Sequence, residues 1–259
     1  MNPLTHEQTL DLLNRHGDSI LDVLWGVEGY YSCPKDEQGN RLGPLVCYAG
    51  TYAPGLHWIG DDYLNFSQME QYPELTAHFA QILYKEILKR VGHVDVFMAA
   101  PEGGKSVAEM LALVSGKRYV YPEKEILALK TETEREKSRW KWGRHEGHIA
   151  SGNRVVLCED LMNNFATDGG DMPKLVWSCD AAIVCLTGWF NRSINHRGLY
   201  PLEHPNGNHV SVPIITIGNK ALPEYRQDDS RVAKDIAAGN ISLKPKHDWP
   251  RLKAAMENA

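Results

Sequence analysis

The chain has 259 residues, of which 42% are hydrophobic and 24% are charged, and its formal net charge at pH 7 is −5. This length can bury one large core, or a core with a smaller appendage, and the composition is that of an ordinary globular protein. The negative charge gives no overall attraction to nucleic acid or anionic lipid. No apolar run approaches the roughly 18 residues of a membrane span, and we expect no secretory signal at the N-terminus.

The first third of the chain predicts a helix, then short strands, then a second helix. Thr5 and Gln8 have the spacing of a capping box before a short helix that Gly17 can end. Residues 18–66 are rich in aromatic and turn residues, which predict short strands and loops. An amphipathic helix is predicted over residues 73–91, with a proline at its start.

From residue 94 onward, apolar strands alternate with helices. Strands are predicted at 94–99, 126–129, 154–158, 181–186 and 212–217, and helices at 105–114 and 171–177. Because the strands are apolar on both faces, the fold class is predicted to be α/β, with a doubly wound parallel sheet covered by helices on both sides. The last 20 residues predict a loosely packed tail helix.

The five cysteines do not have the spacing of a metal site. They lie at positions 33, 47, 158, 179 and 185. Their number is odd, and no two of them have the spacing of a CxxC motif. We therefore expect reduced, buried thiols in a cytoplasmic protein. His145 and His148 lie three residues apart, but no third ligand joins them at a suitable spacing, so a zinc site is not expected.

The segment VVLCEDLMNNFAT, residues 155–167, predicts a binding site at a strand end. Its apolar strand leads to Glu159 and Asp160, and ligands of open parallel sheets bind at such ends. Carboxylates suit the hydroxyls of a sugar, directly or through a divalent cation, and a following turn of N–H groups suits a phosphate. The alternative is that the two acids only cap the next element.

Two further segments allow more than one interpretation. Ala99–Ser106, AAPEGGKS, follows a strand and precedes a helix, so it fits a relaxed phosphate-loop pattern that would bring Lys105 to a phosphate. Residues 130–145 hold six lysines or arginines, three glutamates and two tryptophans. This segment is a nucleic-acid contact, a mobile flap or a solvated hairpin. We favour the flap over nucleic acid, because the segment lies between two predicted strands.

Residues 155–167 resemble the phosphoribosyl pyrophosphate (PRPP) motif of type I phosphoribosyltransferases, and the chain is most similar to the orotate enzymes. In that motif an apolar strand runs into two acids and a phosphate loop. Further similar segments are 146–160, which leads into the motif, 94–113, 49–75 and 212–217. The resemblance spans residues 5–225. It implies an N-terminal hood that binds the base at 1–70, a phosphoribosyltransferase-type α/β core at 71–225 and a helical tail at 226–259.

The resemblance also implies an activity and a partner. The expected reaction transfers ribose 5-phosphate from PRPP to a nitrogenous base, orotate or a related pyrimidine, and releases pyrophosphate in pyrimidine nucleotide biosynthesis. Mg²⁺ is the expected cofactor, held by Glu159 and Asp160, and a homodimer is the expected assembly. The implied catalytic residues are Lys105, Lys137 and Asp160. The residues implied to bind PRPP are Glu102, Gly103, Gly104, Lys105, Lys130, His145, Glu159, Asp160, Asn163, Asn164, Phe165, Ala166 and Thr167.

The chain departs from the family pattern at two places. The phosphate loop has NNFA where the family has small threonines and glycines, and a phenylalanine there can crowd the approach of a phosphate. LHWIGDD, residues 56–62, replaces the basic segment of the hood. Two alternatives therefore stay open: a catalytically weakened member that binds a nucleotide as a regulator, and a phosphate-loop NTPase that uses Ala99–Ser106.

Overall fold

The computed structural model describes residues 3–53, 55–128, 137–165 and 170–258. The chain forms two compact units, each built from two stretches of sequence. The first unit comprises Met1–Ile20 and Glu70–Lys220, and the second comprises Leu21–Met69 and Ala221–Ala259. These boundaries differ from the predicted division, because the N-terminal helix belongs with the core and the C-terminal residues belong with 21–69.

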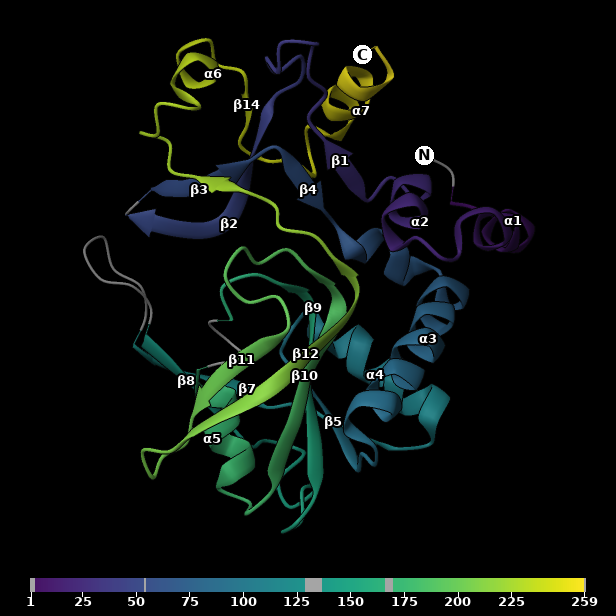
Figure 1. Cartoon of the computed structure of the whole chain (residues 1–259), viewed down its shortest axis with the longest axis vertical. Coiled ribbons are helices and arrows are strands. Elements are labelled where there is room, and N and C mark those ends of the chain that lie inside the picture. Colours follow the sequence, from purple (N-terminus) through teal and green to yellow (C-terminus); the bar gives the residue numbers. More distant parts are fainter. Residues whose placement is uncertain (1–2, 54, 129–136, 166–169, 259) are drawn as a thin grey trace. The chain divides into compact units, whose positions relative to one another are not determined.

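The first unit is an α/β unit (Figure 1). Its helices are α1 (His6–His16), α3 (Pro73–Val91), α4 (Gly104–Ser115) and α5 (Asp171–Trp177). Its strands are β5 (Val96–Ala99), β6 (Arg118–Val120), β7 (Glu123–Ala128), β8 (Lys137–Lys141), β9 (Arg154–Met162), β10 (Ala182–Asn191), β11 (Leu199–Glu203) and β12 (His209–Asn219). The 3-10 helix η1 (Phe66–Gln71) leads into this unit from the other one.

A six-stranded sheet forms the centre of the first unit, in the order β11-β12-β10-β9-β5-β6. All neighbours are parallel except β11, which pairs antiparallel with β12. The predicted parallel α/β sheet is thus present. The predicted core strand at 126–129 is wrong, because β7 pairs with β8 in a separate hairpin and β6 forms the sheet edge. Ile126 and Leu127 are both exposed, so neither side of β7 is a core face.

Helices cover both faces of this sheet. Phe97 of β5 meets Tyr84 of α3 edge to face, with ring centroids 6.2 Å apart. The next residue, Met98, belongs to a buried cluster that includes Met172 and Val176 of α5. Because successive strand residues point to opposite faces, the two contacts identify the two helical layers, as Figure 1 also shows.

The helix ends follow the local sequence signals. Thr5 and Gln8 form the predicted capping box, with the Gln8 N–H donating to Thr5 Oγ1 at 3.3 Å and the Thr5 N–H donating to Gln8 Oε1 at 2.9 Å. Helix α3 begins at Pro73, whose missing N–H costs nothing in the first turn, and ends before Gly92. These two helices are confirmed at the predicted positions.

The second unit is a small mixed unit. It contains α2 (Ile20–Gly26), β1 (Tyr30–Ser32), β2 (Leu45–Ala53), β3 (Leu56–Gly60), β4 (Asp62–Leu64), β13 (Glu224–Tyr225), α6 (Ala233–Ala237), β14 (Ile241–Ser242) and α7 (Trp249–Glu257). Four strands form a sheet in the order β13-β3-β2-β14, and β1 pairs with β4. The fully buried Leu252 of α7 packs in a cluster with Tyr31, Cys33 and Val46. The residues predicted as a loosely packed tail are therefore an integral part of this unit.

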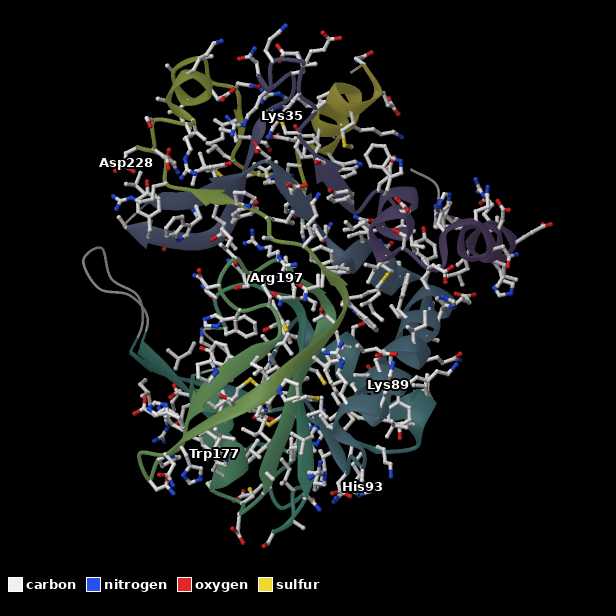
Figure 2. The ribbon with its side chains drawn as sticks, in the orientation of Figure 1. Lys35, Lys89, His93, Trp177, Arg197 and Asp228 are labelled. Atoms are coloured by element: carbon white, nitrogen blue, oxygen red, sulfur yellow. The ribbon has the colours of Figure 1, made fainter. Side chains whose placement is uncertain are left out.

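A buried ion network joins the two stretches of the second unit. The Arg41 guanidinium bonds to Asp61 and, at 3.0 Å, to Asp235, and Lys35, labelled in Figure 2, bonds to Asp61 at 2.9 Å. Burial alone would raise the pKa of Asp61, but the hydrogen bonds from Arg41 and Lys35 lower it below its usual range. The network therefore holds Asp61 in its charged form.

The cysteines form no disulfide bonds within the described residues. All five cysteines are free, four of them buried and Cys179 half-buried. In the part of the chain that the structure describes, no helix combines the length and the apolar character needed to cross a membrane.

Candidate functional site

Glu159 and Asp160 lie near the carboxyl end of the central strand β9. The strand continues to Met162, so both acids are within it, and both are half-buried. The Leu161 N–H donates to Asp160 Oδ1 at 2.8 Å, and the Asp160 N–H donates to Glu159 Oε1 at 3.3 Å. Backbone hydrogen bonds thus orient both carboxylates at this end of the sheet.

The turn between β5 and α4 packs directly against Asp160. The Ala100 N–H donates to the Cys158 carbonyl at 2.8 Å, which joins the start of the turn to β9. Gly103 lies against the Asp160 carboxylate, and Gly104 lies against the Cys158 carbonyl, so closely that neither position has room for a Cβ. The Pro101–Glu102 peptide bond in this turn is cis. The two segments that the sequence analysis selected independently are therefore side by side.

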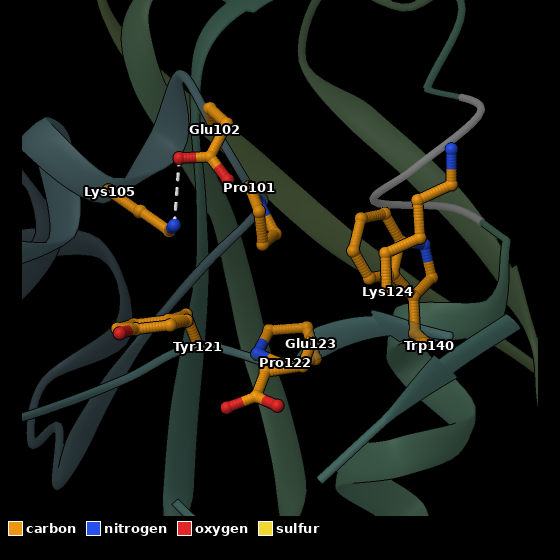
Figure 3. A pocket seen from close by; sticks show the side chains of 8 residues that line it. All are labelled: Pro101, Glu102, Lys105, Tyr121, Pro122, Glu123, Lys124 and Trp140. Carbon is orange, nitrogen blue, oxygen red and sulfur yellow. Dashed lines mark hydrogen bonds and ion pairs between the residues drawn. The ribbon is translucent and has the colours of Figure 1, made fainter. Parts of the chain in front are cut away.

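Lys105 is the second residue of helix α4, beside this turn. Its ammonium group lies 2.7 Å from the Glu102 carboxylate and 4.5 Å above the centroid of the Tyr121 ring. Figure 3 shows the Lys105–Glu102 pair at the rim of a hollow. The cation thus contacts one exposed carboxylate and one aromatic face.

The hollow beside the turn has a volume of about 360 Å³. It is bounded by the turn residues Pro101, Glu102 and Lys105, and by Tyr121, Lys124 and Trp140. Glu159 and Asp160 are not among the described residues that line it. The turn therefore separates two places, with the acids against Gly103 and the hollow beside Glu102 and Lys105.

The turn uses its own N–H groups, which disfavours the phosphate-loop interpretation of Ala99–Ser106. The Gly104 N–H donates to the Ala100 carbonyl at 2.9 Å, and the Lys105 N–H donates to the Glu102 carbonyl at 3.1 Å. A phosphate loop directs such N–H groups at the phosphates instead. We therefore give this segment no role as an NTPase loop.

Phe165 occupies the predicted phosphate loop with its ring turned into the core. It is 4% exposed, stacks on Tyr200 at 4.6 Å between centroids, and meets His196 edge to face at 5.6 Å. Its φ of 56° is in the left-handed region that favours glycine. Asn163 is half-buried and Asn164 exposed. Ala166 and Thr167 lie outside the described residues, so the predicted loop is described only in its first three residues.

The predicted flap is a hairpin of β7 and β8. Arg139 and Lys141 of β8 both bond to Glu125 of β7, at 2.6 and 2.9 Å. These two hydrogen bonds, the one from Lys141 first, lower the pKa of Glu125. Lys130 lies outside the described residues, and Lys137 is described only as the first residue of β8.

His145 lies behind the hollow, next to Tyr121. The two rings meet edge to face at 4.6 Å, and His145 Nδ1 lies 3.2 Å from His148 Nδ1. Burial lowers the pKa of His145, and the charges of His148 and Arg144 lower it further. Within the described residues, no group of three potential ligands is placed to hold a metal ion.

Sequence reasoning missed the second wall of the hollow. Tyr121 follows the edge strand β6, and nothing in the local sequence marks its contact with Lys105. The alternation of Tyr119, Val120 and Tyr121 after Gly116, which ends α4, was an available signal for a strand there. Without that strand, the position of the hairpin beside the turn could not be inferred.

Comparisons with known proteins give structural likeness only. No protein-family model and no curated protein matches the chain. The orotate phosphoribosyltransferase of Aeropyrum pernix is 16% identical, with a TM-score of 0.47, over 77% of this chain and 92% of that one. The adenine phosphoribosyltransferase of Leishmania tarentolae is 15% identical, with a TM-score of 0.39, over 51% and 64%. The UMP synthase of Leishmania donovani is 12% identical, with a TM-score of 0.45, over 95% and 43%.

The chain thus spans less than two thirds of the Leishmania tarentolae enzyme and less than half of the UMP synthase. At these identities and TM-scores the likeness concerns the course of the chain and establishes no activity. These three solved structures, to which this chain is similar, are two phosphoribosyltransferases and a UMP synthase.

Proposed function

We propose that this protein is a phosphoribosyltransferase, which transfers ribose 5-phosphate from PRPP to a nitrogenous base and releases pyrophosphate. One observation carries the proposal: the carboxylate of Asp160 packs against Gly103 of the glycine-rich turn. Because of this contact, the carboxylates that could bind two sugar hydroxyls lie next to the turn. In the same turn, Lys105 could bind a phosphate. The resemblance of residues 94–113 and 155–167 to the family's motifs supports the same ligand.

In this proposal, different residues bind different parts of PRPP. Glu159 and Asp160 accept hydrogen bonds from the ribose hydroxyls. The turn from Glu102 to Lys105 receives the pyrophosphate through the Lys105 ammonium group, because the N–H groups of Gly104 and Lys105 are bonded within the turn. The 5′-phosphate goes to the loop Asn163, Asn164, Phe165, Ala166 and Thr167. The Lys105 ammonium group stabilises the charge that grows on the leaving pyrophosphate, where a single such contact is worth about 2.7–4 kcal/mol.

The acids also fit a magnesium ion. Mg²⁺ prefers oxygen ligands and is commonly held by one or two carboxylates together with substrate oxygens, so Glu159 and Asp160 are sufficient without a third protein ligand. When bound, the ion would neutralise pyrophosphate charge. Asp160, held against the turn, is the better placed of the two to reach both the sugar and the pyrophosphate.

The hairpin β7–β8 closes the site against water in this proposal. Bond breaking at C1 gives an oxocarbenium-like sugar that water would hydrolyse, so exclusion of water protects the transfer. Lys130, Lys137 and His145 are the proposed hairpin contacts to PRPP, and Lys137 is the proposed catalytic lysine. We further propose a homodimer in the cytoplasm, with orotate or a related pyrimidine as the base.

Phe165 favours a second candidate, in which the protein binds a nucleotide as a regulator without turnover. Its ring is committed to the core against Tyr200 and His196, and the family pattern has small residues at this loop. Because its ring is anchored in the core, the backbone at Phe165 has less freedom to close around a phosphate than a loop of small residues would have. The acids and the turn still hold a ribose phosphate in this candidate.

A screen of nitrogenous bases with PRPP and Mg²⁺, followed by pyrophosphate release, separates the two candidates. An active transferase releases pyrophosphate with one base, and Lys105→Met lowers the rate by at least tenfold while Lys89→Met, on the exposed end of α3, leaves it unchanged. Retained binding of PRPP without release for any base supports the regulator. Absence of both binding and release contradicts both candidates.

A further inference from the structure

The hollow beside the β5–α4 turn is lined by aromatic side chains, which are not required to bind a ribose phosphate. Its volume of about 360 Å³ falls within the range of small-molecule sites, roughly 300–1,000 Å³. Tyr121, in the link between β6 and β7, and Trp140 of β8 present aromatic rings to it, as Figure 3 shows. Aromatic rings bind other planar rings by stacking, whereas sugars and phosphates need hydrogen bonds and charge.

Tyr121 is fixed before any ligand arrives. Lys105 lies 4.5 Å from its ring centroid, His145 meets it edge to face at 4.6 Å, and Arg144 donates to its hydroxyl at 3.3 Å. A ring held on three sides loses little freedom when a ligand stacks on it. Tyr121 is therefore suited to act as a preformed wall.

Lys105 gives the hollow a positive group that an anionic ligand can use. Its ammonium group lies at the rim, beside Glu102 and over the Tyr121 ring. Glu123 uses its carboxylate elsewhere, because it accepts the Arg144 N–H at 3.2 Å and packs against Gly143. Glu102 does pair with Lys105, but its side chain is 83% exposed, and exposed ion pairs are weak. An anion in the hollow can replace Glu102 at Lys105.

We propose that this hollow binds a nucleotide-sized anion, with the planar aromatic ring against Tyr121 and Trp140 and the phosphate at Lys105. The site is separate from the acids, since Asp160 contacts the turn at Gly103 and does not line the hollow. The ligand and PRPP would share Lys105 and exclude each other, and this consequence alone rests on the proposed function.

Calorimetric titration of the full chain with adenosine 5′-monophosphate tests the site. Trp140→Leu and Lys105→Met should each weaken binding by at least tenfold, while Trp140→Phe, which keeps an aromatic ring, should retain it. Trp25→Leu is the matched control, because the Trp25 side chain is exposed and is not part of the hollow. Adenosine without phosphate should bind more weakly than the monophosphate in the native protein.

Asp160→Asn distinguishes this site from the proposed PRPP site. The proposal requires that Asp160→Asn keeps the monophosphate binding that Trp140→Leu loses. Loss of binding in Asp160→Asn together with unchanged binding in Trp140→Leu would assign the nucleotide to the acids and overturn the proposal, as would no detectable binding by the native protein. Binding of the monophosphate without binding of PRPP would refute the proposed function and leave this site standing.

Discussion

The carboxylate of Asp160 packs against the α carbon of Gly103, where the β5–α4 turn meets strand β9. A Cβ at residue 103 would overlap both carboxylate oxygens. The φ of Gly103 is −58°, a value that any residue can adopt. Space beside Asp160, and not backbone freedom, is therefore the reason for glycine at this position.

Gly103→Ala should disturb both stability and ligand binding. The added methyl group must displace Asp160 or the turn, and overpacking of this kind costs about 1–3 kcal/mol. Urea denaturation should show that loss, and the affinity for PRPP should fall by at least tenfold. Gly198→Ala is the matched control, because nothing lies within 4 Å of a Cβ there. Equal effects of the two substitutions would mean that the contact of Gly103 with Asp160 does not determine the stability or the affinity for PRPP.

Substitutions at Phe165 should separate its packing from its backbone conformation. Phe165→Ala removes the buried ring from its stack on Tyr200 and should lower the free energy of unfolding by about 3–5 kcal/mol. Phe165→Gly should recover about 1 kcal/mol of this loss, because glycine adopts the φ of 56° without a steric penalty. Chemical denaturation of the native protein, Phe165→Ala and Phe165→Gly measures both the loss of packing and the gain from relief of the backbone conformation. A glycine variant less stable than the alanine variant would contradict the assignment.

The Arg41–Asp61 pair should make stability depend on pH in the acid range. The pKa of Asp61 is lowered in the folded protein, so its contribution is fully present above the unfolded value of about 3.9 and is lost as pH falls through the folded pKa. Arg41→Met leaves a buried carboxylate without its main partner and should cost about 3–5 kcal/mol at pH 7.

Denaturation at a series of pH values tests that expectation. The stability difference between the native protein and Arg41→Met should shrink as the pH falls below about 3.9 and through the lowered pKa of folded Asp61. Arg226→Met serves as the control, because the Arg226 side chain is half exposed and forms its ion pair with the exposed Asp228. A difference that stays constant down to pH 3 would show that Asp61 does not carry the effect.

Local signals predicted those parts of the fold that local chemistry decides. The capping box of Thr5 and Gln8 and the proline at residue 73 set the starts of α1 and α3, because both act within one helical turn. The apolar runs that became β5, β9, β10 and β12 predicted the parallel sheet. The strand predicted at 126–129 was wrongly assigned to the central sheet, because a short apolar run in the sequence does not show whether the strand is buried.

Long-range contacts account for what the sequence could not predict. β14 pairs with β2 and Leu252 packs near Tyr31, so the C-terminal residues join a unit formed by residues far away in the chain. The contact of Asp160 with Gly103 depends on β5 and β9 being neighbours in the sheet, and the predicted fold class did not specify the order of the strands. The contact of Lys105 with Tyr121 depends on the unpredicted strand β6.

Calorimetric titration of the full chain with PRPP and Mg²⁺ tests most directly whether the acids and the turn hold a ribose phosphate. We predict binding by the native protein and at least a tenfold weaker affinity in Asp160→Asn, with Asp180→Asn, a substitution remote from the turn, binding as the native protein does. No heat from the native protein, or equal affinity in Asp160→Asn, would contradict the proposed site.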